Sequence, residues 1–305
     1  MKKVYDCVVL GGGPAGLSAG IYLARFNRSV LVVDKHDGRS SYAQKNENYL
    51  GFPRGIQARE LCARGRQQAE KYGAKMSVDT IISIKKTRKG FTLEGQKNTY
   101  LSRTLILAMG VTDLFPHIGD WKHFVGKSLF WCITCDGYKT IGKKILVIGQ
   151  DDGAACTALQ FLNYTKDISF VTNIHKGKET ASTLWLDRLR KRNIPYYSQN
   201  ILKMKGKRGF ITEVELEDGT QLFPEMVFNQ QGSIPNYELA AQLGVSLNQH
   251  KCVCVDSEQR TNIPFVYAAG DITSLHSHQI ATAVHEGSMA AQAANYDLYE
   301  EYQRT

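Results

Sequence analysis

The sequence predicts an α/β protein of two domains, each built on a β-α-β unit, and three observations predict it. An apolar run at Tyr5–Leu10 enters the glycine-rich turn Gly11–Gly16, and a helical pattern and a second strand follow. The same succession recurs from Lys144 to Thr172, which is an internal repeat. With 305 residues, 43% hydrophobic and 22% charged, the chain is long enough for two domains with cores of their own.

The first β-α-β unit carries a complete dinucleotide-binding pattern. The helical pattern covers Leu17–Phe26, and the second strand, Ser29–Val33, ends at Asp34. An acid at that place can accept hydrogen bonds from an adenosine ribose, and the helix N-terminus offers N–H groups to phosphates. Gly11 allows a tight turn, Gly13 allows the backbone to approach a pyrophosphate, and Gly16 allows close helix–strand packing.

The remaining elements complete the two domains. We expect an amphipathic helix around Gln57–Tyr72, strands at Ile81–Lys86, Gly90–Glu94 and Leu105–Ala108, a second unit with a strand at Lys144–Gly149, a helix at Ala154–Tyr164 and a strand at Ile168–Thr172, further strands near Gly209–Leu216 and at Phe265–Ala268, and a final helix at His278–Ala293. The last part of the chain is expected to fold back onto the first domain. The predicted domains are therefore 1–114 with 246–305, and 115–245.

The stretch Trp131–Tyr138 carries the candidate chemistry. Cys132 and Cys135 are spaced closely enough to form a small disulfide ring, and the neighbouring Asp136 could pass protons as the pair is reduced and reoxidised. Three readings are open for such a pair: half a zinc site, a redox disulfide or two inert thiols. Zinc needs about four ligands, and the sequence has no second pair at matching spacing.

Composition and charge exclude several classes. No apolar run approaches the roughly 20 residues of a membrane span, and the basic start leads straight into a strand, so we expect no secretory signal and a cytoplasmic protein. The net charge of +9 is dispersed, and no nucleic-acid recognition motif accompanies it. The basic clusters at Lys85–Lys89, Arg188–Arg192 and Lys203–Arg208 fit an acidic partner, an anionic cofactor or a solvated surface equally well.

Motifs along almost the whole chain resemble those of the low-molecular-weight thioredoxin reductases. They are Gly11–Gly16, Glu47–Ile56, the Cys132–Tyr138 stretch, Gly232–Asn236, and Ala269–Asp271 followed by His278–Ala281. The resemblance implies two Rossmann-like domains of the three-layer ββα type, an FAD-binding domain in two segments and an inserted nucleotide-binding-type domain with the cysteines. It also implies a homodimer that passes electrons from NADPH through FAD to the disulfide and on to a thiol or disulfide partner.

The resemblance also implies the site residues. Cys135 would be the thiol nearer the flavin, Cys132 the thiol that attacks the partner disulfide, and Asp136 the acid and base; a turn cap is the structural alternative for Asp136. The residues implied around FAD are Gly11, Gly13, Pro14, Ala15, Gly16, Asp34, Asn48, Gly110, Gly270, Asp271, His278, Gln279 and Ile280.

The second β-α-β unit departs from the family. Its turn, Gly149–Ala154, has Asp151 where a glycine should let the backbone meet a pyrophosphate, and Asp152 adds a second carboxylate. A helix N-terminus supplies only about half a positive charge. The family's arginines for the NADPH 2′-phosphate are absent from Asn173–Lys178, where Lys176 and Lys178 stand instead. We therefore expect NADPH not to bind.

Two histidine questions accompany this departure. His278 stands where the family commonly has arginine, beside the inferred flavin site, and could contact a proton or a phosphate. His276 and His285 are close in sequence, but no carboxylate or cysteine completes a ligand set, so we expect no metal. Tyrosines of the tail, Tyr296, Tyr299 and Tyr302, could pack in the core or a dimer, or stack on an exposed flavin.

The pattern of a kept disulfide and a lost NADPH signature resembles the cyanobacterial diflavin-linked disulfide oxidoreductases most. In that interpretation a second FAD lies near the first in place of NADPH. The alternatives are a ferredoxin-dependent flavin thioredoxin reductase, an NADPH-dependent thioredoxin reductase with a degenerate cofactor site, and a flavin-based redox sensor that is not an enzyme. The sequence leaves open the donor, the acceptor and the direction of electron flow.

Overall fold

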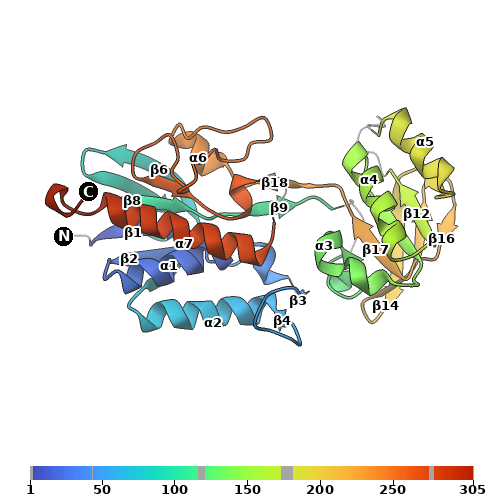
Figure 1. Cartoon of the computed structure of the whole chain (residues 1–305), viewed down its shortest axis with the longest axis horizontal. Helices are drawn as coiled ribbons and strands as arrows, with labels where there is room; N and C mark the ends of the chain where they lie inside the picture. The colour runs from blue at the N-terminus through green and yellow to red at the C-terminus, as the bar shows by residue number, and fades with distance from the viewer. Residues whose placement is uncertain (1–2, 43, 116–120, 173–180, 275–277, 305) are drawn as a thin grey trace. The chain divides into compact units, whose positions relative to one another are not determined.

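The structure, a computed structural model, describes residues 3–42, 44–115, 121–172, 181–274 and 278–304. The predicted α/β class is confirmed by two compact units, each with helices and a sheet that contains parallel strands (Figure 1). Unit 1 comprises 1–42, 49–112 and 234–305, and unit 2 comprises 43–48 and 113–233. Residues 173–180, with the predicted Lys176 and Lys178, and His276 lie outside the described residues.

Unit 1 is built on a seven-stranded sheet in which parallel β5, β2, β1 and β8 lie in that order. β8 pairs with β1 along most of its length, while β7 and β19 pair with its first and last residues respectively. The strands are β1 Val4–Leu10, β2 Val30–Asp34, β5 Lys75–Val78, β6 Ile81–Thr87, β7 Gly90–Gly95, β8 Thr99–Leu107 and β19 Val266–Ala268. Because β19 follows the insertion of unit 2, the late residues of the chain complete the sheet begun by the first.

Helices cover one face of this sheet. Helix α1 (Pro14–Arg25) lies alongside α7 (Ile280–Asp297), and α2 (Ala58–Lys71) packs beside α1 (Figure 1). Small side chains dominate the buried surface of α1 and α7, so the two helices approach closely. On the other side, side chains of the parallel strands share a core with residues of the antiparallel β6 and β7. The short α6 (Glu238–Gln242) and the loops that follow it contribute to the same core.

Unit 2 repeats the parallel arrangement on a smaller scale. Its five strands lie in the order β10-β17-β11-β12-β13, all parallel, and a three-stranded antiparallel sheet β14-β15-β16 accompanies them. Their bounds are β10 Leu129–Phe130, β11 Ile145–Ile148, β12 Ile168–Val171, β13 Tyr196–Tyr197, β14 Ile201–Lys207, β15 Phe210–Leu216, β16 Gln221–Leu222 and β17 Met226–Asn229. Helices α4 (Asp152–Gln160) and α5 (Thr183–Lys191) pack with them around an aromatic core.

Short elements complete the chain. Helix α3 (Ile133–Asp136) continues into the 3-10 helix η3 (Gly137–Thr140). The remaining elements are η1 Arg39–Ser41, β3 Lys45–Asn46, β4 Ile56–Gln57, β9 Val111–Asp113, η2 Trp121–Phe124, η4 Phe161–Asn163, β18 Ser233–Pro235, η5 Asp271–Thr273 and η6 Glu301–Gln303. Among the described helices, none is long and apolar enough to cross a membrane.

The chain returns to unit 1 earlier than the sequence suggests. Division by packing places the second crossing at 233/234, whereas the predicted boundary is 245/246. The physical reason is that Ala240 and Val245 are buried against the strands of unit 1, in the same cluster as Val8 and Leu93. An apolar pattern shows that a segment is buried but not which of two cores receives it.

Candidate functional site

The glycine-rich turn after β1 is shaped by close backbone approaches. Gly11 has a φ of +106°, and a Cβ there would lie 2.2 Å from the carbonyl oxygen of Ala108. A Cβ on Gly16 would lie 1.9 Å from the carbonyl oxygen of Gly11. At Gly13, by contrast, the nearest atom to a Cβ would be Ser40 Oγ at 3.8 Å. Two of the predicted glycines are therefore required by packing, and the third leaves open space at the start of α1.

The N-terminus of α1 is available to an anion. Gly13 is the N-cap and Pro14 follows it, so the N-cap residue has no side chain with which to cap the first N–H groups. At the neighbouring end of β2, Asp34 lines a cavity of about 260 Å³. Its lining residues are Gly12, Leu17, Val32, Asp34, His36, Arg66, Met76, Ser77 and Val78. A carboxylate in a largely apolar hollow beside an uncapped helix start suits the adenosine and pyrophosphate of a dinucleotide.

Two other predicted contact residues, Gly270 and Asp271, lie where α7 meets α1. Gly270 has a φ of +82°, and its N–H donates to Glu286 Oε2 at 2.6 Å. Asp271 accepts a 2.7 Å hydrogen bond from Arg39, an ion pair that joins it to η1. A Cβ on Gly287 would lie 2.1 Å from the carbonyl oxygen of Ala15. Close packing of the two helices thus holds Gly270 and Asp271 beside the start of α1.

The other predicted contact residues of unit 1 differ in their surroundings. His278 Nε2 lies 2.7 Å from the carbonyl oxygen of Ser274, and Gln279 is the N-cap of α7, which begins at Ile280. Gly110 has a φ of +63°, and its carbonyl oxygen accepts from Asn236 N–H. Asn48 is exposed and belongs to the segment 43–48 of unit 2.

In unit 2, Cys132 and Cys135 are joined by a disulfide. Cys132 is the N-cap of α3, and its Sγ accepts from Cys135 N–H at 3.1 Å. Its carbonyl oxygen accepts from the N–H groups of both Cys135 and Asp136. The single turn of α3 therefore places the two cysteines and the backbone N–H of Asp136 together.

Asp136 is an almost completely buried acid, with 1% of its surface exposed. Its Oδ1 accepts a 2.8 Å hydrogen bond from Lys139, while Oδ2 has no hydrogen-bond partner among the described residues. Burial raises the pKa of Asp136, and the hydrogen bond from Lys139 only partly opposes this. A carboxyl group with a raised pKa, next to a disulfide in the chain, is suited to acid–base work.

Lys139 bridges two carboxylates. Its Nζ lies 2.8 Å from Asp136 Oδ1 and 2.8 Å from Glu47 Oε2. Tyr138 donates a 2.6 Å hydrogen bond to the same oxygen of Glu47. The hydrogen bonds from Lys139 and Tyr138 lower the pKa of Glu47 to about 2, so this carboxylate stays charged. The sequence did not predict that Lys139, Glu47 and Tyr138 belong to the site. Glu47 is remote from the other two in the chain, and a lysine three residues after an aspartate is common on helix surfaces.

The second glycine turn is closed by its own carboxylates. Asp151 is the N-cap of α4, and its Oδ1 accepts from Ala154 N–H at 2.8 Å. Asp152 accepts from Ser182 N–H at 2.6 Å and from Ser182 Oγ at 3.1 Å. The helix start that would face a pyrophosphate is thus already occupied by negative charge, in contrast to the uncapped α1.

These features define a class of protein. Three features of unit 1 fit a flavin dinucleotide: open space at Gly13, a helix start with a glycine N-cap, and a largely apolar hollow lined by Asp34. FAD, when bound, would supply two-electron chemistry. Unit 2 carries a disulfide with a buried acid. The combination is that of a flavin-dependent disulfide oxidoreductase. Within the described residues, no group of three histidine, cysteine or acidic side chains could hold a metal ion.

Comparison with known proteins agrees with this class. The model of the pyridine nucleotide-disulphide oxidoreductase family matches residues 5–293, and the chain belongs to that family. Thioredoxin reductase of Bacillus subtilis is 26% identical over 100% of this chain and 98% of its own length. The structure of T. acidophilum thioredoxin reductase is 34% identical, with a TM-score of 0.63, covering 97% of this chain and 99% of that one. Thioredoxin reductase from Streptococcus pyogenes, at 23% identity and a TM-score of 0.90, shows the fold over 98% and 99% of the two chains.

Proposed function

We propose that this protein passes electrons between FAD in unit 1 and a thiol or disulfide partner through the Cys132–Cys135 pair, without NADPH. The partner is a thioredoxin-type protein or a small thiol, as the names of the relatives suggest. Unit 1 is the FAD-binding domain, and the working form is a homodimer. A second FAD in the NADPH-type site of unit 2, as in the cyanobacterial diflavin-linked enzymes, is part of the proposal.

The capped start of α4 is the observation that supports the absence of NADPH. Asp151 uses its carboxylate to accept the Ala154 N–H that a pyrophosphate would otherwise use. Moving Asp151 away would break the cap, and leaving it in place would set like charges against each other. A second flavin also carries a pyrophosphate, so it would have to enter unit 2 by another approach than this helix start.

The cysteines and Asp136 have complementary roles in the proposed reaction. When the pair is reduced, Cys132 as a thiolate attacks a partner disulfide, forming one S–S bond and breaking another. Cys135 then attacks Cys132, which closes the ring and releases the second partner thiol. Asp136 takes the proton from the attacking thiol and returns it to the leaving sulfur. The reverse direction uses the same steps backwards.

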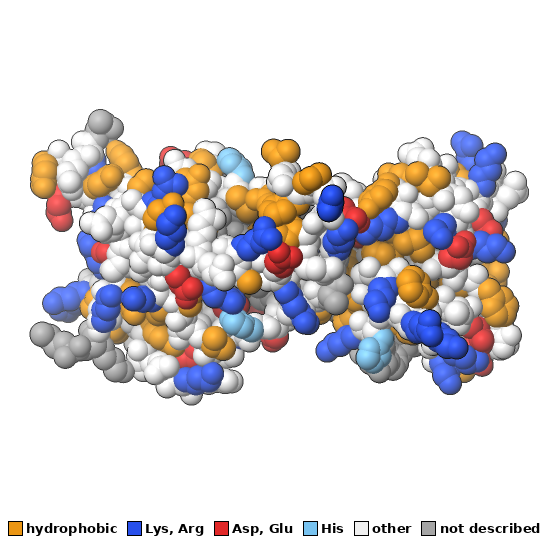
Figure 2. Space-filling view, turned by 90° about the horizontal axis from the view of Figure 1, so that it is seen from below, with side chains coloured by type: hydrophobic (Ala, Val, Ile, Leu, Met, Phe, Trp, Pro, Cys, Tyr) orange, Lys and Arg blue, Asp and Glu red, His pale blue; other side chains and the backbone are white. Residues whose placement is uncertain are grey.

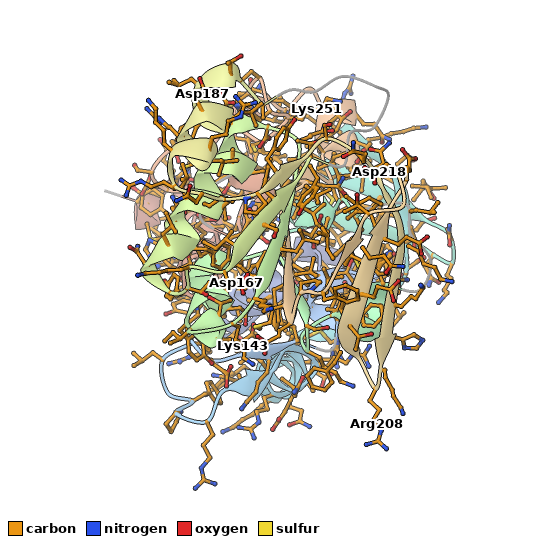
Figure 3. The ribbon with its side chains drawn as sticks, turned by 90° about the vertical axis from the view of Figure 1, so that its right-hand side faces the viewer. Lys143, Asp167, Asp187, Arg208, Asp218 and Lys251 are labelled. Atoms are coloured by element: carbon orange, nitrogen blue, oxygen red, sulfur yellow. A yellow bond between two sulfur atoms is a disulfide. The ribbon has the colours of Figure 1, made fainter. Side chains whose placement is uncertain are left out.

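A ferredoxin-linked reductase is the second candidate, and one surface favours it. A groove of about 720 Å³ in unit 2 is lined by His123, Phe124, Lys127, Lys203, Met204, Lys205, Gly206, Arg208 and Gly209. Its charged side chains are all basic, and Arg208 extends outward at the tip of the β14–β15 hairpin (Figure 3). Lysine and arginine also cluster with a histidine on one part of the unit 2 surface (Figure 2). An acidic electron carrier would be attracted to such a groove.

The deciding experiment is anaerobic flavin absorbance of the purified protein, with FAD counted per chain before excess NADPH is added. Two flavins per chain and no bleaching support the diflavin form, and one flavin without bleaching favours the ferredoxin-linked form. Rapid bleaching by micromolar NADPH would overturn the proposal. The Cys135→Ser variant is the companion: if reoxidation of its flavin by disulfides is unchanged, the Cys132–Cys135 pair is not the route.

A further inference from the structure

Asp136, Lys139, Glu47 and Tyr138 form a connected polar cluster next to the disulfide. The chain of contacts runs from the buried Asp136 to Lys139, then to Glu47, and from Glu47 to the half-exposed Tyr138. Lys45 reaches the other oxygen of Glu47 at 3.2 Å. Each ionic group has an oppositely charged neighbour, but only Asp136 is withdrawn from water.

We propose that Lys139 and Glu47 are positioning residues that set the protonation of Asp136 in opposite senses. The proposal rests on the proposed function, in which Asp136 moves the proton of thiol–disulfide exchange. Lys139 favours the carboxylate form of Asp136 through a direct contact, and Glu47 opposes it through its negative charge while holding Lys139 in place.

The geometry explains why the pair is needed. Burial alone favours the protonated form of Asp136, which can donate a proton but not accept one. A lysine paired with Asp136 alone would favour the carboxylate strongly, and the group could accept but not donate. A lysine shared at equal distance between two carboxylates gives an intermediate bias, as acid–base exchange in both directions requires.

The other groups that face Asp136 do not replace this pair. Burial, Lys139, Glu47 and the neutral Gln44 are the influences on the Asp136 carboxyl group. Tyr138 donates its hydrogen bond to Glu47 and not to Asp136. Lys45 contacts Glu47 and not Asp136. Lys139 is therefore the one cation, among the described residues, that contacts Asp136 directly.

The test compares FAD-loaded full-length Lys139→Met and Glu47→Gln with the parent protein. Infrared difference spectroscopy follows the protonated carboxyl band of Asp136 against pH in the resting oxidised state, and Asp136→Asn identifies the band. The pH dependence of exchange between the dithiol form and 5,5′-dithiobis(2-nitrobenzoate) is measured in parallel. Lys143→Met is the matched control, because Lys143 pairs with Glu225 instead.

We expect the titration midpoint of Asp136 to rise by about one to two pH units in Lys139→Met and to fall in Glu47→Gln. Lys143→Met and the charge-conserving Lys139→Arg should leave it within a few tenths of a unit. Midpoints that do not move, or that move in the same direction in both variants, would overturn the inference. If the carboxyl band shifts as expected but the exchange profile does not, the tuning holds and the proposed role of Asp136 fails. Should Lys139→Met not fold, Glu47→Gln alone decides.

Discussion

At the scale of the residue, the burial of Asp136 places a cost on the fold that depends on pH. Its pKa is raised above the ordinary 3.8 because burial disfavours the charged form. The folded chain therefore binds this proton more tightly than the unfolded chain does. The sign follows from linkage: stability is unaffected below the ordinary pKa and falls as the pH rises through the raised one, by about 1.4 kcal/mol for each unit of difference.

The Asp136→Asn variant should remove this pH dependence. Asparagine has no proton to lose, so we expect the free energy of unfolding to decline less than in the parent as the pH rises above the ordinary pKa of 3.8. Urea denaturation at a series of pH values measures this. Asp167→Asn is the control, because the Asp167 side chain is largely exposed and its ion pair with Lys144 is long, at 3.9 Å. Parallel curves for Asp136→Asn and the parent would show that Asp136 ionises without penalty.

Asp151 allows its two effects, capping and charge, to be separated. Asp151→Ala removes the hydrogen bond to Ala154 N–H and should destabilise the protein by about 1 kcal/mol. Asp151→Asn keeps an acceptor without the charge and should destabilise the protein by only a few tenths of a kcal/mol. Thermal melting monitored by circular dichroism measures both. Equal melting temperatures for Asp151→Ala and the parent would mean that the cap contributes nothing.

The residues of this site were not equally predictable. Asp151 could be identified from the sequence because its place in the glycine turn is set by local spacing, and the structure adds that it caps α4. Glu47 and Lys139 could not be paired, because their contact depends on where the segment 43–48 packs. A pattern within one turn or helix is local, whereas a charge pair between distant segments exists only in the folded chain.

At the scale of the element, the contact between α1 and α7 holds both parts of the candidate flavin site. Gly287→Ala should force the helices apart, because the new Cβ would lie 2.1 Å from the carbonyl oxygen of Ala15. We expect a loss of about 1–3 kcal/mol in the free energy of unfolding and a lower FAD content. Gly38→Ala is the control, since no atom lies within 4 Å of a Cβ there. Equal urea midpoints for the two variants would refute close packing at Gly287.

The elements themselves were largely predictable, with errors at their ends. α1 begins at Pro14 and not Leu17, because proline fits the first turn of a helix and the glycine turn supplies the N-cap. The early return to unit 1 at 234 was not predictable, because α6 is short and its apolar residues fit either core. Periodicity identifies a helix from apolar residues that recur on one face over several turns, and a helix of five residues is too short for such a repeat.

At the scale of the whole molecule, the two units have separate cores, and 113–233 is one continuous insertion. The core of unit 2 is formed by its own strands and helices, with Phe130, Phe161, Phe170 and Phe228 at its centre. A chain that buries its apolar residues within itself should not need the rest of the protein to fold.

We therefore expect residues 113–233, expressed alone, to unfold cooperatively and to form the Cys132–Cys135 disulfide. The fragment lacks Glu47, so the cluster at Asp136 keeps only its contact with Lys139. Thermal melting by circular dichroism tests the folding, and counting free thiols before and after reduction tests the disulfide. The Phe228→Ala fragment is the control, since loss of this buried ring should cost about 3–5 kcal/mol and abolish the transition. A parent fragment that melts without cooperativity would mean that the core of 113–233 depends on the rest of the chain, and the expectation that this insertion folds by itself would be wrong.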